Sequence, residues 1–418
     1  MTVLWCEADS YKSAQGVPAP YIDFAIKIDS ISNIGRYSQK GTGIMALEKQ
    51  GGLEGVVAAT TRLSRVDGAA GKLILAGYTV EEIAPRASFE EMAHLLWYGT
   101  IPNARELRDL TTDFASRRHL PAVTVTLLRE AARNAVPPMD ALRMACGTLS
   151  LGKRESSDEE ARTLVASFPT IVGAYHRLGS GLEPLEPRGD LSHAEYCLHQ
   201  LFGGEVGQER ARGLETYLNT VCDHGLNAST FAARVIVSTH SDLISAVTGA
   251  VGALKGPLHG GAPGPALDMV FEIGRPERAE QVILSKLAHG ERLMGFGHRV
   301  YRVRDPRADV LGAAAERFYA TEGNGELYRL ARAVEKVALR VLAEKKPGRR
   351  LDTNVEFYTA LLLHGLGIPK ELFTPIFAIG RVLGWTAHCL EQLRDGRLIR
   401  PESEYVGPVG LEFEPISA

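Results

Sequence analysis

The sequence predicts an all-α protein, mainly helical with a minor β contribution near the N-terminus. Helix-capping signals followed by apolar residues at spacings of three and four recur along most of the chain, as in amphipathic helices. Strand signals are few: residues 22–28 alternate large apolar with polar or small side chains, and residues 71–80 read as a short hairpin. We therefore expect one mostly helical core with a small sheet near its start.

Four local signals predict where helices begin. Ser88-x-x-Glu91 and Ser192-x-x-Glu195 are capping boxes, in which each side chain bonds the other residue's backbone N–H. Thr374-Pro375 supplies an N-cap and a proline at the first helical position, and Asp305-Pro306-Arg307 puts an arginine in a first turn. Residues 231–254 are rich in small side chains and read as one buried helix, either central or at a subunit interface.

The composition is that of a soluble globular protein, with 45% of the 418 residues hydrophobic and 23% charged. The net charge of −3, with basic and acidic residues intermixed, argues against nucleic-acid binding. No charge-free run of 18 apolar residues predicts a membrane span, and no signal peptide is expected. Five cysteines without a C-x-x-C pair indicate a reduced, cytoplasmic protein rather than a zinc site or disulfide framework.

Three short segments each carry a chemically committed side chain in backbone suited to a turn. They are Gly-Pro-Leu-His259-Gly-Gly-Ala, Gly-Phe-Gly-His298-Arg-Val-Tyr and Asn-Val-Glu356-Phe-Tyr. Glycine and proline let the main chain turn tightly and approach a ligand. A fourth segment, Asp-His224-Gly-Leu-Asn, adds a histidine at a predicted helix boundary. Each residue alone also fits an ordinary structural role, but together they suffice for acid/base chemistry on a carbonyl compound.

Arginines gather after the second histidine, at Arg299, Arg302, Arg304 and Arg307, and two more candidates are Arg381 and Arg400. Each alone reads as a solvated side chain, whereas together they indicate an anion site, because guanidinium binds carboxylate or phosphate bidentately and a helix N-terminus adds its dipole. No His-Glu-x-x-His, Gly-x-Ser-x-Gly or phosphate-binding glycine loop occurs. A metal site, a serine hydrolase and a nucleotide-binding enzyme are therefore poor interpretations.

Taken together, these segments resemble the citrate synthase family, in the branch that also contains 2-methylcitrate synthases. The resemblance covers about residues 50–410 and depends on the joint spacing of many motifs. They are Gly52-Leu-Glu-Gly-Val56, Val66-Asp-Gly68, Gly77-Tyr78, His224–Thr230, the His259 and His298 motifs, Asp305-Pro-Arg307, Phe377–Trp385, Leu398–Pro401 and Tyr405–Pro408.

The resemblance implies a homodimer of mostly helical subunits. Residues 1–260 and 372–418 are expected to form a large domain, and residues 261–371 a small domain that closes over the substrates. The implied reaction is the condensation of acetyl-CoA with oxaloacetate, an acyltransferase step of the tricarboxylic acid cycle in which the acyl group becomes alkyl, followed by hydrolysis to citrate and CoA. No tightly bound cofactor or metal is expected, because histidines and arginines carry the polarising role.

The chemical problem is to remove a proton from the methyl group of a thioester while stabilising the enolate that forms. By resemblance, His259 donates a hydrogen bond to the thioester oxygen, Glu356 accepts the proton, and His298 polarises and protonates the oxaloacetate carbonyl. Oxaloacetate is expected to contact His224, Arg307, Arg381 and Arg400, the last of these from the partner subunit. CoA is expected to contact Leu293, Met294, Gly295, Gly297 and Arg302.

One position departs from the family pattern. The family's usual base is aspartate in Asn-Val-Asp-Phe, and here the aligned residue is Glu356. Its carboxylate sits one methylene further out, and a misplacement of about 1 Å can lower a rate roughly a hundredfold. Either the backbone retreats to accommodate the longer arm, or the enzyme is slow or takes an altered substrate. Asp352, about one helical turn earlier, is the weaker alternative as base.

Three other functions stay open from the sequence. A 2-methylcitrate synthase would use propionyl-CoA, and the extra methylene is worth only about 1–3 kcal/mol in a pocket. A family member that has lost catalysis and acts as a binding or regulatory protein is the second alternative, favoured only by Glu356. A lyase that cleaves citryl-CoA is the third. The first 50 residues are interpreted as a strand or arm that contacts the partner subunit.

Overall fold

The structure is a computed structural model that describes residues 52, 53, 55–151, 155–260, 263–298, 300–322, 325–413 and 415. The chain divides into two compact units, Met1–Val57 and Ala58–Ala418. The strand predicted at residues 22–28 and the predicted N-terminal arm lie outside the described residues. All helices and strands of the described residues belong to the second unit.

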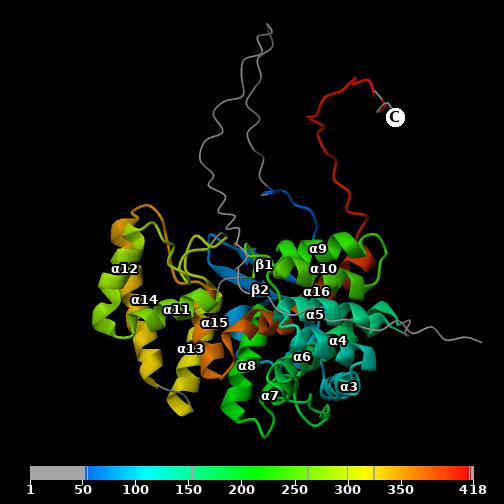
Figure 1. Cartoon of the computed structure of the whole chain (residues 1–418), viewed down its shortest axis with the longest axis horizontal. Coiled ribbons are helices and arrows are strands. Elements are labelled where there is room, and N and C mark those ends of the chain that lie inside the picture. Colours follow the sequence, from blue (N-terminus) through cyan, green and yellow to red (C-terminus); the bar gives the residue numbers. More distant parts are fainter. Residues whose placement is uncertain are drawn as a thin grey trace, which may run out of the picture. The chain divides into compact units, whose positions relative to one another are not determined.

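The second unit is built mainly from α-helices, as the sequence predicts (Figure 1). They are α1 (Val80–Ile83), α2 (Phe89–Tyr98), α3 (Ala104–Ser116), α4 (Ala122–Arg133), α5 (Pro138–Gly147), α6 (Ser157–Gly179), α7 (His193–Phe202), α8 (Gln208–Val221), α9 (Ala228–Val237), α10 (Leu243–Leu254), α11 (Pro263–Ile273), α12 (Ala279–Ala288), α13 (Pro306–Thr321), α14 (Gly325–Lys345), α15 (Val355–Gly365) and α16 (Phe373–Asp395). Three 3-10 turns, Thr148–Ser150, Pro276–Arg278 and Lys370–Leu372, join them. Helix α16 packs against α6, α8, α9 and α10 and is buried along most of its length, which explains its apolar sequence.

The sheet is a three-stranded antiparallel meander of β1 (Ser64–Asp67), β2 (Lys72–Leu75) and β3 (Tyr78–Thr79), and it confirms the predicted hairpin. Asp67 pairs with Lys72 across the first turn. That turn packs on the loop that follows His298: a Cβ on Gly68 would lie 2.3 Å from the Val300 carbonyl oxygen. The backbone N–H of Arg302 donates to the Gly68 carbonyl at 2.7 Å. The hairpin therefore supports the backbone between His298 and Arg307.

The helix-start predictions are confirmed at three of four places. Ser88 and Ser192 form the predicted capping boxes, and Asp305 caps α13 by accepting the Arg307 N–H. The prediction for Thr374 is wrong, because the 3-10 turn before α16 leads straight into the helix and leaves no extended residue to act as a cap. The Thr374 hydroxyl instead donates to the Gly260 carbonyl at 2.7 Å, where it supports the His259 turn.

The single helix predicted at residues 231–254 is also wrong. The segment contains the end of α9 and all of α10, separated by a turn in which His240 has a φ of 63°. Asp242 accepts the Ser245 N–H at 2.6 Å and starts α10, so a strong cap prevails over the helical propensity of the flanking residues. The small residues still bring the two helices close together: a Cβ on Gly249 would lie 2.3 Å from Ile236.

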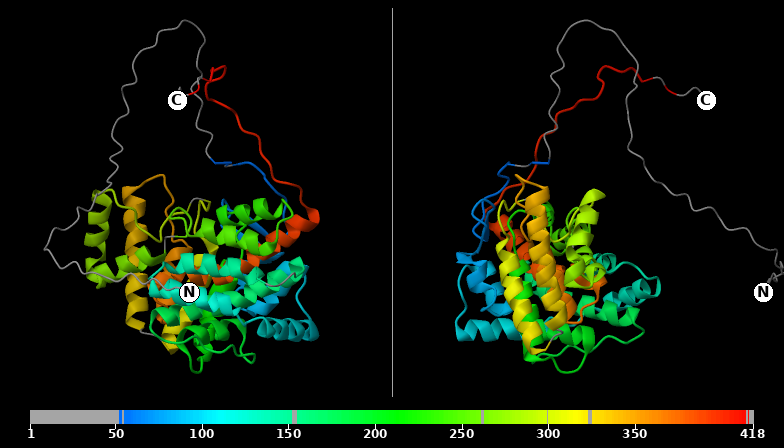
Figure 2. Two further views of the ribbon diagram at one scale, coloured as in Figure 1. Left: turned by 45° about the vertical axis from the view of Figure 1, so that its right-hand side comes forward. Right: turned by 90° about the vertical axis from the view of Figure 1, so that its left-hand side faces the viewer.

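The described helices form two groups. Helices α11, α12 and α14 lie at one end of the body, next to the packed pair α13 and α15 (Figures 1 and 2). The pair reaches the remaining helices through α8, which packs against both of its members.

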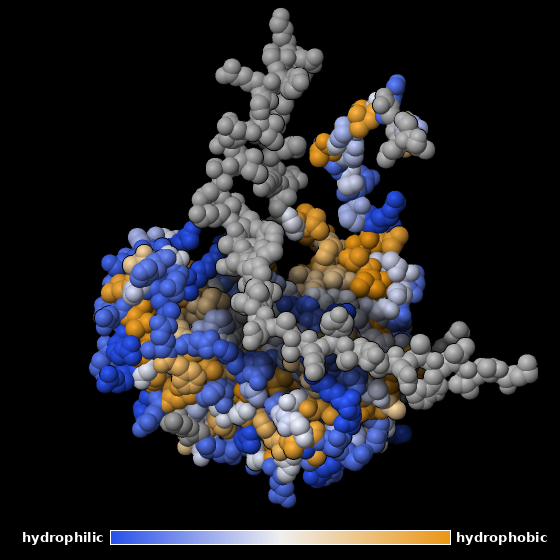
Figure 3. All heavy atoms as spheres, in the orientation of Figure 1, coloured by the Kyte–Doolittle hydropathy of each residue, from blue (hydrophilic) through white to orange (hydrophobic). Residues whose placement is uncertain are grey.

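The chain after α16 leaves the helices as an extended tail (Figures 1 and 2). Its large apolar side chains alternate with polar ones along its length (Figure 3). Those that are at least 70% exposed are Tyr405, Val406, Val409, Leu411 and Phe413. An exposed run of this kind is typical of a surface that contacts another molecule.

Two expectations from the composition can be compared with the described residues. No helix among them is both long and apolar enough to cross a membrane. Cys146, Cys197, Cys222 and Cys389 are buried and unpaired. They therefore behave as small core residues, as predicted, while Cys6 lies outside the described residues.

Candidate active site

Two of the predicted histidines lie side by side around a tyrosine. His224 follows α8 and His298 precedes α13, yet their ring centroids are 5.9 Å apart. The Tyr301 ring lies 5.6 Å from the first and 4.9 Å from the second. The Tyr301 hydroxyl is 3.0 Å from His224 Nε2 and forms a hydrogen bond with it. The fold thus brings together residues that are far apart in the sequence.

The backbone sets the protonation state of His298. Its Nδ1 accepts the N–H groups of Val300 at 3.0 Å and Tyr301 at 3.1 Å. Burial and the nearby Arg307 charge lower the pKa of His298 to about 4, so the ring is neutral near pH 7. A neutral ring that accepts at Nδ1 carries its proton on Nε2.

His298 Nε2 faces another donor. The Arg307 Nη2 atom lies 3.3 Å away from it, so two N–H groups point towards the same space without an acceptor between them. Arg307 is otherwise held by Asp305, which accepts its Nε–H at 3.0 Å and an Nη2–H at 2.8 Å. Burial opposes the charge of Arg307, but Asp305 outweighs burial and raises its pKa. The pair of donors suits a carboxylate or carbonyl oxygen of a ligand.

His259 lies in a turn that requires glycine. The backbone N–H of His259 donates to the Gly256 carbonyl at 2.9 Å, and a Cβ on Gly260 would lie 2.3 Å from the Leu254 carbonyl oxygen. Burial, together with the charge of Arg381, lowers the pKa of His259 to about 4. This ring is also neutral near pH 7.

A single hydroxyl determines which nitrogen of His259 carries the proton. Ser229 Oγ lies 2.8 Å from His259 Nε2 and 2.8 Å from Asn227 Oδ1, and it accepts the Trp385 indole N–H at 3.1 Å. If the Ser229 proton goes to His259 Nε2, then Nδ1 keeps the ring proton and can donate to a ligand. With the hydroxyl donating to Asn227 Oδ1, as it does in this structure, the imidazole donates to Ser229 and Nδ1 is an acceptor until the hydroxyl turns.

Arg381 is a buried cation in the middle of α16, only 2% exposed. Its Nε–H donates to the Val221 carbonyl at 2.7 Å, and its guanidinium stacks 4.5 Å from the centroid of the Phe377 ring. Burial lowers the pKa of Arg381 to about 10, with the Asp223 charge acting in the opposite direction. Its terminal nitrogens make no hydrogen bond to any described residue, which leaves them available to an anionic ligand.

Glu356 is the second residue of α15, where Asn354 caps the helix by accepting its N–H at 3.0 Å. Within the described residues, no donor hydrogen-bonds its carboxylate. Burial raises the pKa of Glu356 to about 6, although the Arg307 charge acts to lower it. A carboxylate that has a raised pKa, accepts no hydrogen bond from a described residue and lies close enough to Arg307 to be influenced by its charge has the properties of a general base.

A short backbone bridge joins the loop that contains His298 to the start of α15. Gly297 N–H donates to the Asp352 carbonyl at 2.7 Å, and Asn354 N–H donates to the Gly295 carbonyl at 3.0 Å. Gly295 and Gly297 both have positive φ, 88° and 81°, which explains why glycine occupies these positions. The bridge links His298 and Glu356 through one rigid piece of backbone.

The other residues predicted to contact oxaloacetate or CoA make no hydrogen bond with the three predicted catalytic side chains in the described structure. Arg400 is exposed in the tail and makes no hydrogen bond or ion pair with a described residue. Arg302 is exposed next to the hairpin, and Leu293, Met294, Gly295 and Gly297 form the backbone before His298. Arg304, a candidate for phosphate binding, is paired with Asp309 and Glu335, and Arg299 lies outside the described residues.

Sequence reasoning missed a buried network behind His224. Its neighbour Asp223 accepts from Ser64, and His388 Nε2 lies 3.2 Å from the same carboxylate. His388 Nδ1 accepts an Arg234 N–H at 2.9 Å, and Arg234 also pairs with Glu391. The sequence held one signal for this network: His388 and Glu391 are polar residues within an otherwise mostly apolar helix. No group of His, Cys, Asp and Glu that could hold a metal ion occurs in the described part of the chain.

Comparisons with known proteins point to one family. Residues 52–402 match the family model described as "Citrate synthase, C-terminal domain". Similar proteins include citrate synthase 2 of Bacillus subtilis, 42% identical over 87% of this chain and 98% of its own length, and citrate synthase of Haloferax volcanii, 40% identical over 89% and 99%. A 2-methylcitrate synthase of Shewanella oneidensis is 37% identical over 88% of this chain and 97% of its own length.

Solved structures agree with this family. Citrate synthase from Thermotoga maritima superimposes with a TM-score of 0.77 at 40% identity, over 88% of this chain and 98% of that one. Citrate synthase from Thermoplasma acidophilum, in a ternary complex with carboxymethyl coenzyme A and oxaloacetate, superimposes with a TM-score of 0.76 at 31% identity, over 87% of this chain and 97% of that one.

Proposed function

The chain belongs to the citrate synthase family, and we propose that it condenses acetyl-CoA with oxaloacetate and hydrolyses the product thioester to citrate and CoA. This makes it an acyltransferase that converts the acyl group to alkyl. The observation that carries the proposal is the contact between His298 Nε2 and Arg307 Nη2, whose nitrogens are 3.3 Å apart; both are donors in the tautomer in which His298 Nδ1 accepts from the backbone. Together with the open guanidinium of Arg381, they suit an α-keto dicarboxylate.

The proposed first step is proton removal from the acetyl methyl group. Glu356 accepts the proton, and its pKa of about 6 leaves it ionised near pH 7 while keeping it more basic than an ordinary glutamate. His259 donates from Nδ1 to the thioester oxygen and stabilises the enolate, once the Ser229 hydroxyl turns from Asn227 Oδ1 to donate to Nε2. A neutral imidazole suits this role, because a hydrogen bond to the developing oxyanion does not require a full proton transfer.

In the second step the enolate carbon attacks the keto carbon of oxaloacetate. His298 polarises the carbonyl through Nε2–H and supplies the proton to the new alkoxide. Arg307 and Arg381 bind the carboxylates, and His224 binds the same substrate beside Tyr301. Water then hydrolyses the thioester. These roles need no tightly bound cofactor, since acetyl-CoA enters as a co-substrate, and the CoA adenine is proposed to lie against residues 293–297.

We further propose that the longer Glu356 side chain is a working base and that the start of α15 is set back to accommodate it. No described residue donates a hydrogen bond to its carboxylate, which supports this assignment, since a carboxylate held by donors would be a weaker base. A family member without catalysis would not need a raised pKa at this position. Asp352 is not proposed as the base, because it lies before the cap of α15.

A homodimer is proposed in which Arg400 reaches the oxaloacetate site of the partner subunit. The exposed apolar side chains of the tail after α16 support an interface there. We also propose that residues 261–371 move as a small domain against residues 1–260 and 372–418, and that the protein is cytoplasmic, as its unpaired cysteines favour. Light scattering should give twice the mass of one 45.3 kDa chain; a monomer would contradict the role of Arg400.

The second candidate function is 2-methylcitrate synthesis from propionyl-CoA, favoured by relatives of that name. The test for both is free thiol release from purified protein given oxaloacetate and either acetyl-CoA or propionyl-CoA. The proposal expects acetyl-CoA to give the higher kcat/KM. A higher value for propionyl-CoA would support the second function, and no thiol release from either would reject both.

A further inference from the structure

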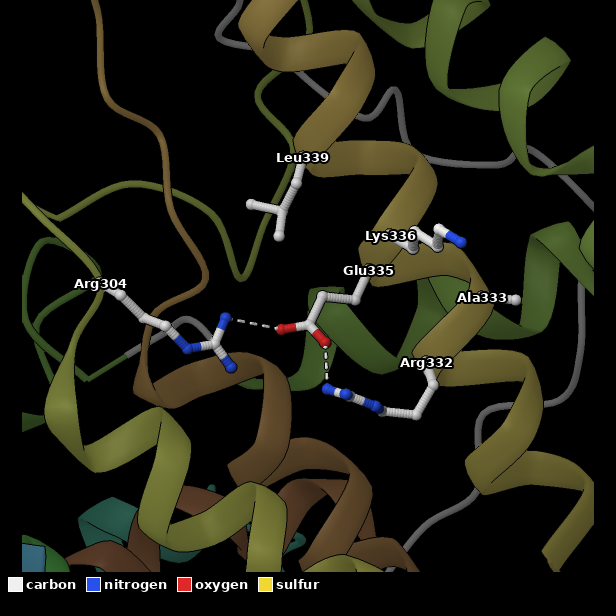
Figure 4. Close-up of a pocket in the computed structure, with 6 residues that line it drawn as sticks. All are labelled: Arg304, Arg332, Ala333, Glu335, Lys336 and Leu339. Atoms are coloured by element: carbon white, nitrogen blue, oxygen red, sulfur yellow. Dashed lines mark hydrogen bonds and ion pairs between the residues drawn. The ribbon is translucent and has the colours of Figure 1, made fainter.

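Glu335 is a glutamate of α14 whose carboxylate is surrounded by donors (Figure 4). One oxygen accepts from Arg304 Nη1 at 3.0 Å and Thr353 Oγ1 at 2.7 Å. The other accepts from Arg332 Nη1 at 2.6 Å and Tyr358 Oη at 2.6 Å. The side chain is only 5% exposed. A carboxylate has about four lone-pair sites, so these four contacts satisfy it completely.

The charge of Glu335 is therefore stable inside the protein. Burial acts to raise its pKa, but the hydrogen bonds from Tyr358 and Thr353 and the Arg304 charge outweigh burial and lower it. Glutamine in its place would remove the charge that pairs with Arg304 and would turn one of the two acceptor oxygens, the one facing Thr353 or the one facing Tyr358, into a donor. Buried donors without an acceptor are costly, so the surrounding side chains would move.

The partners of Glu335 belong to the two segments that form the candidate active site. Arg304 lies in the loop between His298 and Arg307. Thr353 comes directly before the residue that caps α15, and Tyr358 lies in the first turn of that helix. Glu356 lies between Thr353 and Tyr358 in the sequence, and its carboxylate accepts no hydrogen bond from a described residue. The Glu335 carboxylate thus connects the loop that follows His298 with the residues on both sides of Glu356.

We propose that Glu335 is a positioning residue for the condensation, holding Glu356 in register with His298 and Arg307. This inference rests on the proposed function. Glutamate at the base position has one more rotatable bond than aspartate, so its carboxylate can occupy more positions and depends on well-fixed surroundings to reach the productive one. Misplacement of about 1 Å is enough for a roughly hundredfold loss of rate, and a supporting shell of this kind prevents it.

The test compares Glu335→Gln with wild type and with Glu344→Gln. Glutamine keeps the shape of the side chain but loses its charge and one acceptor. Glu344 is an exposed glutamate of the same helix, paired only with Arg340, and serves as the matched control. We expect kcat to fall at least about tenfold in Glu335→Gln, with KM for oxaloacetate within about threefold of wild type and Glu344→Gln unchanged.

If Glu335→Gln does not fold, the variants Tyr358→Phe and Thr353→Val replace it. Each removes one hydrogen-bond donor to Glu335 and leaves the other three donors in place. Both are expected to lower kcat more than KM. Unchanged kcat per folded molecule in all these variants would overturn the proposal and leave Glu335 as a stabilising residue only.

A second readout does not depend on turnover. Hydrogen exchange followed by mass spectrometry should show faster exchange in peptides covering residues 300–305 and 353–358 of Glu335→Gln, and no change in Glu344→Gln. Unchanged exchange in those peptides would overturn the positioning role even if kcat falls. If wild type itself releases no CoA, the proposed function fails, and the exchange result still decides whether Glu335 holds the two segments.

Discussion

Glu335 and Glu356 are two glutamates with opposite hydrogen-bond environments and opposite pKa shifts. Glu335, on α14, receives four donors, which lower its pKa against the effect of burial. Glu356, at the start of α15, receives none from the described residues, and burial raises its pKa to about 6. The difference shows that burial alone does not decide whether a carboxylate is a structural anion or a base.

Local backbone explains part of this contrast. The first turn of α15 has free N–H groups, but Asn354 takes the N–H of Glu356 through its own side chain. Thr353 and Tyr358, on either side of it, direct their hydroxyls to Glu335 instead. The donors nearest to the proposed base are therefore used elsewhere.

The largest effect is expected from removing the unpartnered carboxylate. Glu356→Gln keeps the size of the side chain but cannot accept a proton, so kcat should fall by about 10²–10⁴-fold, the usual contribution of a general base. Oxaloacetate binding, measured by calorimetry, should stay within about threefold of wild type. Near-normal turnover would reject Glu356 as the base.

A smaller loss of kcat is expected from shortening the side chain at position 356. Glu356→Asp restores the residue usual in the family, but the backbone here is proposed to be set for glutamate. The carboxylate would then stop about one methylene short, and kcat should fall about ten- to a hundredfold. Turnover equal to or above wild type would show that the start of α15 is not set back.

The hydroxyl behind His259 should matter less than the base. Ser229→Ala removes the only side chain hydrogen-bonded to His259 Nε2 in the described structure, so no hydroxyl is left that can turn to donate to Nε2 and favour the proton on Nδ1. We expect kcat to fall about tenfold, with KM for oxaloacetate nearly unchanged. Ser285→Ala, at an exposed serine of α12, is the control. Equal rates for both variants would contradict the proposed role of Ser229.

The smallest effect concerns stability rather than turnover. Glu215 has two donors, the Phe89 N–H and Arg212, and burial with the Glu90 charge raises its pKa to about 7. Because this folded-state pKa lies above the ordinary value of 4.5, its stabilising contribution is complete below pH 4.5 and is lost as pH rises through about 7.

Wild type should therefore lose on the order of 2 kcal/mol more unfolding free energy between pH 5 and pH 8 than Glu215→Gln does. Urea denaturation at both pH values measures the difference. Parallel pH slopes in the two proteins would mean that two donors already satisfy this carboxylate, which would weaken the contrast between Glu335 and Glu356.

Much of the fold could be predicted because its signals are local. The capping boxes at Ser88 and Ser192, the Asp305 cap and the hairpin are each encoded within a few residues, and the structure contains all of them. The two wrong predictions, at Thr374 and in residues 231–254, have a common cause. In both places a neighbouring turn decided where a helix begins, and propensity within the helix did not.

The candidate site was predictable only in part. Turn motifs and the family resemblance identified His259, His298 and Glu356, and the structure brings His224, His298 and Arg307 together; their chemical roles stay predictions. Glu335 could not be identified, since in the sequence it is one charged residue among many on an amphipathic helix. Its importance comes from contacts with Arg304, Thr353 and Tyr358, which only tertiary structure creates.

The pH dependence of kcat/KM tests the central claim most directly, because it reports the ionisation of the free enzyme. His259 and His298 have pKa values of about 4, so Glu356 is the proposed catalytic group that titrates near pH 6. We predict that kcat/KM falls tenfold per pH unit below about pH 6 and is level from there to pH 8. A value that stays constant down to pH 5 would contradict the assignment of Glu356 as the proton acceptor.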